Sequence, residues 1–266
     1  MQNNKAKIFV FEKKPSFAEL WDVCLYNFLY DAPKYVREVE QLLIKLGLSK
    51  NAKFIDISAG TGFMSMELSE KGYKFDFMDA TDDEIAVFSK KAKEKNLQIK
   101  CKKIQWLDIP ENYSKNDFDM VFCRGNSFIY AAGGWNKYNK VDYNRSLKLY
   151  EKTLRIFYDL LKVGGYLYID KFKDNEAPEK LLVGKIIISG KSYDLFFYTE
   201  IKKSEKHRMA SMLLRDEEGN EKGLPNVTSI LKLHELILML KKTGFREVKK
   251  LNLRTEKHFD VILAKK

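Results

Sequence analysis

The sequence predicts an α/β fold in which a seven-stranded, mostly parallel sheet ends in an antiparallel hairpin and carries an antiparallel β insertion. Two observations support this prediction. Between residues 54 and 171, short apolar strands alternate with amphipathic helices, which is typical of a parallel sheet with crossover helices on both faces. Between residues 172 and 231, β-branched and aromatic runs are separated by turn residues, without helical periodicity.

The elements follow one another in a clear order. Residues 16–47 have apolar side chains at helical spacing, with Pro33 between two helices and Gly47 at the end of the second. The next predicted elements are strands at 54–57, 73–79, 97–103, 118–123 and 165–171, and helices at 62–70, 82–95 and 143–161. After the insertion come a helix at 233–245 and the two strands of the closing hairpin, 246–253 and 258–266.

This order divides the chain into two parts. Residues 1–171 and 232–266 form the expected core, in which the helices of residues 16–47 would act as a lid. Residues 172–231 form the insertion, which is expected to cap the core.

The composition is that of a globular protein without membrane spans. Of the 266 residues, 45% are hydrophobic and 32% are charged, and no apolar run approaches the roughly 18 residues of a membrane helix. The N-terminal segment has no apolar stretch followed by a cleavage site, and the three cysteines have neither disulfide nor metal-ligand spacing. We therefore expect a cytoplasmic protein without a metal centre.

The net charge of +11 raises the question of nucleic-acid binding. Most of the 48 basic residues are lysines, and they are spread along the chain among 37 acidic residues. A nucleic-acid-binding surface instead gathers its basic residues on one face. The pattern favours a lysine-rich solvated surface, so nucleic acid is not the expected partner, and a small anionic substrate stays open.

A glycine-containing loop, Asp56–Gly62 (DISAGTG), follows the first predicted strand of the sheet, at the edge where open α/β sheets bind ligands. Gly60 and Gly62 lack a Cβ where the chain must turn sharply and approach a ligand. Asp79 ends the next strand and is placed to accept hydrogen bonds from a ribose diol. These features suit both NAD and S-adenosylmethionine, but the dinucleotide fingerprint has Gly or Ala where this chain has Ser65.

From Asp56 to the C-terminus, the chain resembles the class I S-adenosylmethionine-dependent methyltransferases, which have a Rossmann-like fold. The resemblance rests on several motifs in order: DISAGTG, the acid Asp79, FDMVFC, LLKVGGYLYID and the terminal KKTGF and FDVILAKK. Within that class, GNSF after the fourth strand and Gln-Trp-Leu after the third are similar to the glycine and sarcosine N-methyltransferases. The resemblance implies S-adenosylmethionine as the cofactor and S-adenosylhomocysteine as its product.

The resemblance also implies which residues bind the cofactor. Those around its methionine part would be Asp56, Ser58, Ala59, Gly60 and Gly62. Asp79 would bind the ribose hydroxyls and Ala80 would lie beside the adenine. The adenine would be held by Gln105, Trp106 and Leu107, and the end of the fourth strand would contribute Cys123, Arg124 and Ser127.

Substrate-binding candidates lie near the ends of the same strands. Asn126 aligns with a side chain that contacts substrate in the N-methyltransferases. Arg124 follows the apolar run MVFC and needs a partner, which favours an anionic group on cofactor or substrate. Four aromatic residues of the N-terminal helices could face the sulfonium through cation–π interactions or simply pack on the sheet: Trp21, Tyr26, Tyr30 and Tyr35. The remaining candidates are Tyr130 and Trp135, in a glycine-containing loop, and Lys171.

One position departs from the amino-acid N-methyltransferases. They hold the substrate carboxylate with an arginine just after the fifth strand, and this chain has Phe172 there. Glycine itself is therefore not the expected substrate. Lys171, Lys173 and Arg124 are the candidates for replacing that positive charge.

The expected activity is methyl transfer, by in-line displacement, to the nitrogen or oxygen of a small metabolite. Asn126, Tyr130 and Asp170 are the catalytic candidates, and a hydroxyl acceptor would need Tyr130 or Asp170 as a base. An RNA or protein methyltransferase and a non-catalytic cofactor-binding subunit are the alternatives. The sequence leaves open the methyl acceptor and the choice between monomer and homodimer.

Overall fold

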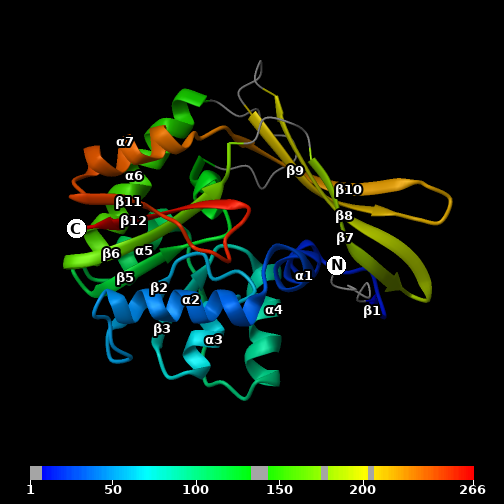
Figure 1. The fold of residues 1–266 in the computed structure, drawn as a ribbon, viewed down its shortest axis with the longest axis horizontal. Helices are drawn as coiled ribbons and strands as arrows, with labels where there is room; N and C mark the ends of the chain where they lie inside the picture. Colours follow the sequence, from blue (N-terminus) through cyan, green and yellow to red (C-terminus); the bar gives the residue numbers. More distant parts are fainter. Residues whose placement is uncertain (1–7, 133–142, 175–178, 203–206) are drawn as a thin grey trace.

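A computed structural model of the chain describes residues 8–132, 143–174, 179–202 and 207–266 (Figure 1). Within these residues, seven strands form one sheet in the order β11-β12-β6-β5-β2-β3-β4. The strands are β2 (Lys53–Asp56), β3 (Lys74–Asp79), β4 (Cys101–Lys103), β5 (Phe118–Cys123), β6 (Leu161–Phe172), β11 (Glu247–Leu251) and β12 (Phe259–Lys265). The neighbouring strands β4, β3, β2, β5 and β6 pair in parallel, whereas β12 pairs antiparallel with both β6 and β11. The predicted fold class, including its closing hairpin, is confirmed.

Apolar residues point to both faces of this sheet. Phe54 and Phe122 lie in the cluster beneath α2 (Ala32–Lys45), whereas their neighbours Ile55 and Val121 lie in the cluster beneath α6 (Tyr143–Leu160) and α7 (Leu233–Thr243). Because successive residues of a strand face opposite sides, a sheet covered on both faces needs continuous apolar strands. The sheet therefore forms the middle layer of the molecule.

The remaining helices of the core follow β2, β3 and β4. They are α3 (Ser65–Glu70), α4 (Asp82–Glu94) and α5 (Ile109–Asn112), with 3-10 turns at Trp106–Asp108 and Ser127–Ala132. Helix α3 begins three residues later than predicted, because Gly62 and Met64 have positive φ angles of 87° and 73° that a helix cannot include. Strand β4 is likewise shorter than the predicted strand 97–103.

The N-terminal helices form as expected, with two differences. Helix α1 (Phe17–Cys24) starts with a capping box between Ser16 and Glu19 and continues into a π-helical turn, Leu25–Leu29. Pro33 does not interrupt a helix but lies in the first turn of α2, where its missing N–H leaves no helical hydrogen bond unmade. Gly47, at φ 73°, follows the last turn of α2, as predicted.

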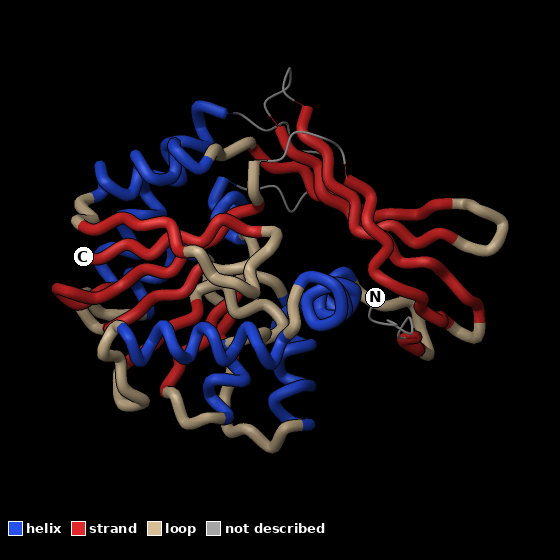
Figure 2. Tube along the Cα trace, in the orientation of Figure 1, coloured by secondary structure: helices blue, strands red, loops and turns tan. Residues whose placement is uncertain are grey.

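A second, five-stranded sheet stands apart from the first (Figure 2). Its antiparallel strands are β7 (Glu179–Ile188), β8 (Lys191–Lys202), β9 (His207–Arg215) and β10 (Glu221–Ser229). The fifth strand, β1 (Ile8–Phe11), pairs in parallel with β7 and was not predicted. Helix α1 packs beneath this sheet, with the rings of Trp21 and Phe197 6.0 Å apart. The second sheet is thus brought over the edge of the first by α1.

Within the described residues, none of the helices combines the length and apolar character that crossing a membrane requires.

Candidate active site

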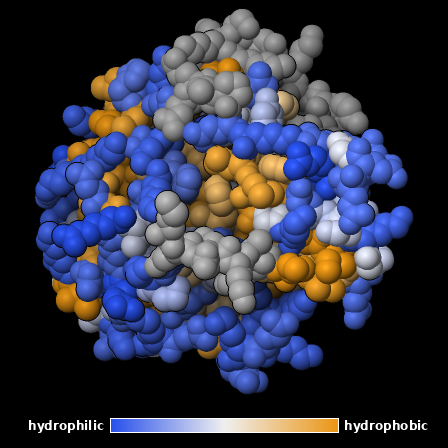
Figure 3. Space-filling view, turned by 45° about the vertical axis from the view of Figure 1, so that its right-hand side comes forward, coloured by the Kyte–Doolittle hydropathy of each residue, from blue (hydrophilic) through white to orange (hydrophobic). Residues whose placement is uncertain are grey.

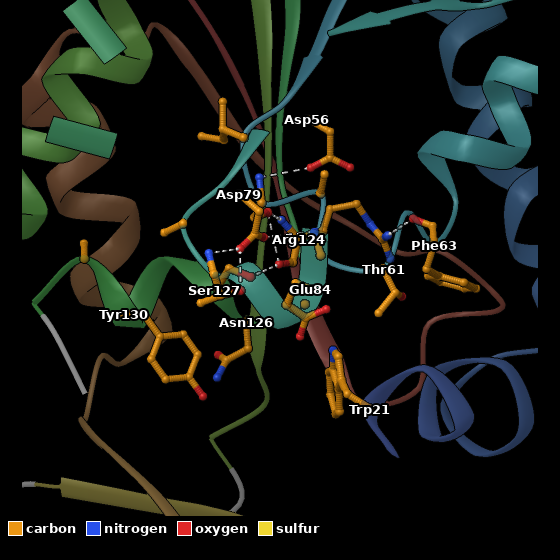
Figure 4. Close-up of a pocket in the computed structure, with 18 of the residues that line it drawn as sticks. Trp21, Asp56, Thr61, Phe63, Asp79, Glu84, Arg124, Asn126, Ser127 and Tyr130 are labelled. Carbon is orange, nitrogen blue, oxygen red and sulfur yellow. Dashed lines mark hydrogen bonds between the residues drawn. The ribbon is translucent and has the colours of Figure 1, made fainter. Parts of the chain in front are cut away.

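A cavity of about 440 Å³ lies at the carboxyl ends of β2, β3 and β5 (Figure 4). The space-filling view shows apolar surface in a central hollow framed by polar residues (Figure 3). The volume of the cavity is within the range of small-molecule sites, and the cavity lies where open α/β sheets bind ligands.

The loop after β2 forms the floor of the cavity. Asp56, buried at the end of β2, accepts hydrogen bonds from Ser65 Oγ (2.6 Å) and from the Ser58 N–H (3.1 Å). Burial raises the pKa of the Asp56 carboxyl to about 6. The predicted residues Asp56, Ser58, Ala59 and Gly60 all line the cavity. Asp56 thus fixes the shape of the loop as well as lining the site.

The carboxylate of Asp79, at the end of β3, reaches the same loop. Its Oδ2 accepts the Gly60 N–H at 2.9 Å, and its Oδ1 accepts the N–H and hydroxyl of Thr81 at 3.0 and 2.9 Å. A carboxylate can accept about four hydrogen bonds, so Asp79 keeps capacity for a ligand hydroxyl. Asp79 and the predicted neighbour Ala80 both line the cavity.

Gly62 has a different role from Gly60. It is not on the cavity wall; a Cβ at Gly62 would lie 2.7 Å from Met66 Cε and 3.0 Å from Phe88 Cδ2. Gly62 is therefore required for the close packing of the loop on α3 and α4, and the structure does not bring it into contact with a ligand in the cavity.

The segment after β4 supplies a further wall, as predicted. Gln105, Trp106 and Leu107 line the cavity. The Trp106 indole N–H donates to the Ile57 carbonyl at 2.6 Å, and its ring packs edge-on against Phe157. These contacts fix the Trp106 ring, so that it offers a rigid surface to a ligand.

Arg124, directly after β5, is a buried cation on the cavity wall. Its Nε donates to the Tyr35 hydroxyl and its Nη1 to the Phe63 carbonyl, both at 3.2 Å. Its guanidinium carbon lies 4.9 Å from the Tyr35 ring centre and 5.2 Å from that of Phe63. Among the described residues, no carboxylate forms an ion pair with Arg124. The partners of Arg124 are therefore aromatic rings and neutral acceptors.

The turn after Arg124 is held by Asp170. Gly125 and Asn126 have φ angles of 70° and 60°, and both of their N–H groups donate to the Asp170 carboxylate, at 3.1 and 2.7 Å. Asn126 Oδ1 accepts the Phe172 N–H at 2.9 Å, which leaves its amide nitrogen on the other side. Asn126, Ser127 and Tyr130 line the cavity, but the fully buried Asp170 does not. The structure thus places Asp170 behind the turn that it orders.

Several other predicted residues are not brought to the cavity. The Tyr30 hydroxyl donates to Glu256 at 2.8 Å, and the Tyr26 hydroxyl donates to Glu67. The Lys171 ammonium donates to the Phe172 carbonyl at 2.7 Å and pairs with Asp174. Cys123 is buried within the sheet. Tyr26, Tyr30, Lys171 and Cys123 therefore have structural contacts, and Trp135 lies outside the described residues.

Most of the other walls of the cavity were missed by sequence reasoning, which named only Trp21 among the N-terminal residues that form them. Helix α1 and the residue after it contribute Phe17, Trp21 and Leu25, whereas the end of β6 and the second sheet contribute Phe172, Phe197, Ala210 and Ser211. These side chains meet only because the N-terminus and the second sheet fold over the same edge. One signal for these walls was present in the sequence: Phe172 stands where the amino-acid N-methyltransferases have an arginine, and it proves to be an apolar residue on the cavity wall.

Two polar groups on the wall lack partners. Thr61 Oγ1 and Glu84 Oε2 are buried without a hydrogen bond to any of the described residues. Burial of an unpaired polar atom is unfavourable, so a polar ligand in the cavity would satisfy them. Together with Asp79 at a strand end, these groups fit a cofactor that carries ribose and amino-acid parts.

A sequence model of the methyltransferase domain family matches residues 48–215. The chain belongs to this methyltransferase family. The match spans the glycine loop, Asp79 and Arg124, and it confirms the expectation of a class I, S-adenosylmethionine-dependent methyltransferase.

Two curated relatives of this methyltransferase are glycine/sarcosine N-methyltransferases. The protein from Aphanothece halophytica is 27% identical over 119 residues, and that from Parasynechococcus marenigrum is 26% identical over 116. The matches cover 45% and 44% of this chain, and 40% and 36% of the relatives' own length. The chain therefore matches less than half the length of either relative.

Solved structures similar to this methyltransferase cover nearly the whole chain. One is an S-adenosylmethionine-dependent methyltransferase from Clostridium acetobutylicum (TM-score 0.65, 14% identity, 94% of this chain and 97% of that one). Another is CalS10, an amino pentose methyltransferase from Micromonospora echinaspora (TM-score 0.65, 10% identity, 95% and 97%). A third is the sugar N-methyltransferase KedS8 from Streptoalloteichus (TM-score 0.61, 16% identity, 95% and 94%). At these identities, the similarity shows the fold.

Proposed function

We propose that this methyltransferase transfers the methyl group of S-adenosylmethionine to a nitrogen or oxygen of a small metabolite by in-line displacement. The observation that carries the proposal is a single cavity with two kinds of wall. One wall holds Asp79 and the loop at Gly60, which suit the cofactor. The other holds Asn126, Tyr130 and Phe172, where an acceptor would lie.

The names of similar proteins favour nitrogen as the accepting atom. The two curated relatives are N-methyltransferases, and so is KedS8, which is described as acting on a sugar. A cavity of this size that residues of α1 and the second sheet help to line also suits a small molecule better than a polymer.

In the proposed reaction, the protein mainly positions the acceptor and excludes water. When bound, S-adenosylmethionine supplies a methyl group activated by its sulfonium. Trp21, Phe172 and Phe197 form apolar walls that keep water from the reacting groups. The Asn126 amide nitrogen is available to donate to the acceptor. Orientation of this kind can contribute roughly 7–11 kcal/mol to lowering the barrier.

The second sheet and α1 suggest a cap over this site. Phe197, Ala210 and Ser211 of the second sheet and Phe17 and Trp21 of α1 line the cavity together. We therefore propose residues 172–231 as a cap domain and residues 16–47 as a helical lid, on a core formed by the rest of the chain.

Asp170 is proposed to position the turn at Asn126 rather than to act as a base. Asp170→Asn is expected to lower the free energy of unfolding by about 1–3 kcal/mol, because an amide has one acceptor oxygen for two backbone N–H groups. Urea unfolding measures this loss, and the pH profile of methyl transfer should keep its shape. Unchanged stability with abolished turnover would instead identify Asp170 as the base.

The cofactor assignment is tested by calorimetric titration with S-adenosylhomocysteine, with NAD titrated in parallel. We expect micromolar binding of S-adenosylhomocysteine and none of NAD. Asp79→Ala should weaken binding at least tenfold, about 1.4 kcal/mol, because it removes the acceptor for the ribose hydroxyls.

The matched control is Asp82→Ala, three residues further along, whose side chain is 79% exposed and pairs with Lys103. This variant should bind like the wild type. Absence of binding to folded wild-type protein would overturn the proposed function. Binding without transfer of labelled methyl groups to amines, alcohols or acidic metabolites would favour a non-catalytic subunit.

A further inference from the structure

Glu84 is a buried acid on the cavity wall that has no role in the reaction proposed above. It lies in the first turn of α4 and is 7% exposed. Its Oε2 has no hydrogen-bond partner among the described residues, and the side chain lines the cavity between Trp21 and Asn126 (Figure 4). An acid buried at this depth without a partner is costly unless a ligand satisfies it.

The Glu84 and Asp79 carboxyl groups converge on one backbone position. A Cβ at Gly60 would lie 3.4 Å from Glu84 Oε2, and the Gly60 N–H donates to Asp79 Oδ2 at 2.9 Å. Gly60 has no side chain to separate the two groups. A ligand that binds Asp79 beside Gly60 therefore also meets Glu84.

The charges around Glu84 are mostly negative. Asp79 faces it from the end of β3, Asp22 from α1 and Asp83 from its own helix, and the nearby cation Lys91 is paired with Asp22 at 2.7 Å. Burial raises the pKa of the Glu84 carboxyl to about 8, and the negative charge of Asp79 adds to the increase. Glu84 is therefore protonated at neutral pH and can donate a hydrogen bond to a ligand.

We infer that Glu84 binds the ribose of the cofactor as a neutral carboxylic acid, its O–H donating a hydrogen bond to a ribose hydroxyl oxygen while Asp79 accepts one from a ribose hydroxyl. This inference rests on the proposed function, because it assigns a second ligand to the same cofactor. It predicts a pH-dependent affinity for the nucleoside part. Ionisation of Glu84 removes the donor and places a second anion beside Asp79.

The test uses 5′-methylthioadenosine, which has the ribose and adenine of the cofactor but no amino-acid group that titrates near neutral pH. Calorimetry from about pH 6 to pH 9.5 should show a constant affinity at low pH. Above pH 8 the affinity should fall by about tenfold per pH unit. Glu84→Gln, which stays neutral, should bind within about threefold of the wild type at pH 6.5 and show no such fall.

Asp82→Asn is the matched control, since it removes one exposed negative charge from the start of the same helix, where Asp82 pairs with Lys103. It should keep the pH dependence of the wild type. A flat wild-type profile, an affinity that rises with pH, or the same fall in Glu84→Gln would each overturn the inference. A rise would show that Glu84 acts as an ionised hydrogen-bond acceptor instead of a neutral donor.

A second measurement tests the contact with the ribose itself. Glu84→Ala should weaken binding of 5′-methylthioadenosine about tenfold but leave binding of its 2′,3′-dideoxy analogue unchanged. An equal loss for both ligands would place Glu84 away from the ribose hydroxyls. Titration of the wild type with S-adenosylhomocysteine at pH 7 separates the two proposals, because its binding supports the cofactor assignment even where the role of Glu84 fails.

Discussion

Replacement of Arg124 by methionine is expected to destabilise the protein by about 3–5 kcal/mol at pH 8. The guanidinium is buried among the rings of Tyr30, Tyr35 and Phe63, and methionine would keep part of that packing while removing the charge. The charge matters because two buried carboxyl groups lie near it: Arg124 lowers the free energy of the ionised forms of both Asp56 and Asp170. Without it, these acids would be buried anions without a counter-charge.

The loss should therefore depend on pH, and its sign can be worked out. Burial already raises the pKa of Asp56 to about 6 and also raises the pKa of Asp170. In the Arg124→Met variant, both pKa values rise further, so the folded state holds protons that the unfolded state releases. The stability of the variant relative to the wild type then falls as pH rises from about 5 to 8. Urea unfolding at these two pH values measures the difference.

Arg37→Met is the matched control, because Arg37 is an exposed arginine on α2. Its substitution should change stability by less than about 0.5 kcal/mol at both pH values. An equal loss for Arg124→Met at pH 5 and pH 8 would contradict the electrostatic account and leave lost packing as the cause.

The parts of the site that follow from local sequence could be predicted well. The loop Asp56–Gly60 and Asp79 follow directly after short apolar strands, and parallel strands bring their carboxyl ends to one edge. The segments after β4 and β5 reach the cavity for the same reason. No distant contact is needed to place these residues, so strand and turn patterns suffice.

The orientation of helical residues could not be predicted in this way. Tyr26 lies in the five-residue π-helical turn that follows α1. Because this turn is not a regular α-helix, α-helical spacing does not predict which of its side chains point toward the cavity. Trp21, in the regular part of α1, lines the cavity instead. Glu84 was missed because the direction of its side chain depends on how α4 packs against the glycine loop.

Long-range contacts account for the other differences. Strand β1 is four residues long and pairs with β7, nearly 180 residues later, so its own sequence carries little signal. Asp170 lies near the end of β6, where an acid could serve a site, yet the positive φ angles of Gly125 and Asn126 turn two N–H groups toward it. Its carboxylate is thereby used for local structure.

Gly62→Ala should be the most damaging single-methyl substitution in the glycine loop, with an expected loss of about 2–5 kcal/mol in the free energy of unfolding. Two costs add. The backbone at φ 87° is unfavourable for an L-residue by roughly 1–2 kcal/mol. The added Cβ would also lie 2.7 Å from Met66 Cε and 3.0 Å from Phe88 Cδ2, and overpacking of this kind costs roughly 1–3 kcal/mol.

Gly47→Ala separates the two costs. Gly47 has a similar φ of 73°, but a Cβ there would have no other atom within 4 Å, so its substitution should cost only the backbone strain, roughly 1–2 kcal/mol. Urea unfolding of both variants gives the difference that belongs to the contact with Met66 and Phe88. Because Gly60 is two residues away and its N–H holds Asp79, Gly62→Ala should also weaken S-adenosylhomocysteine binding, whereas Gly47→Ala should not. Equal stability and equal binding in the two variants would show that the loop and Met66 can move apart without cost, and that Gly62 is needed for its backbone conformation alone.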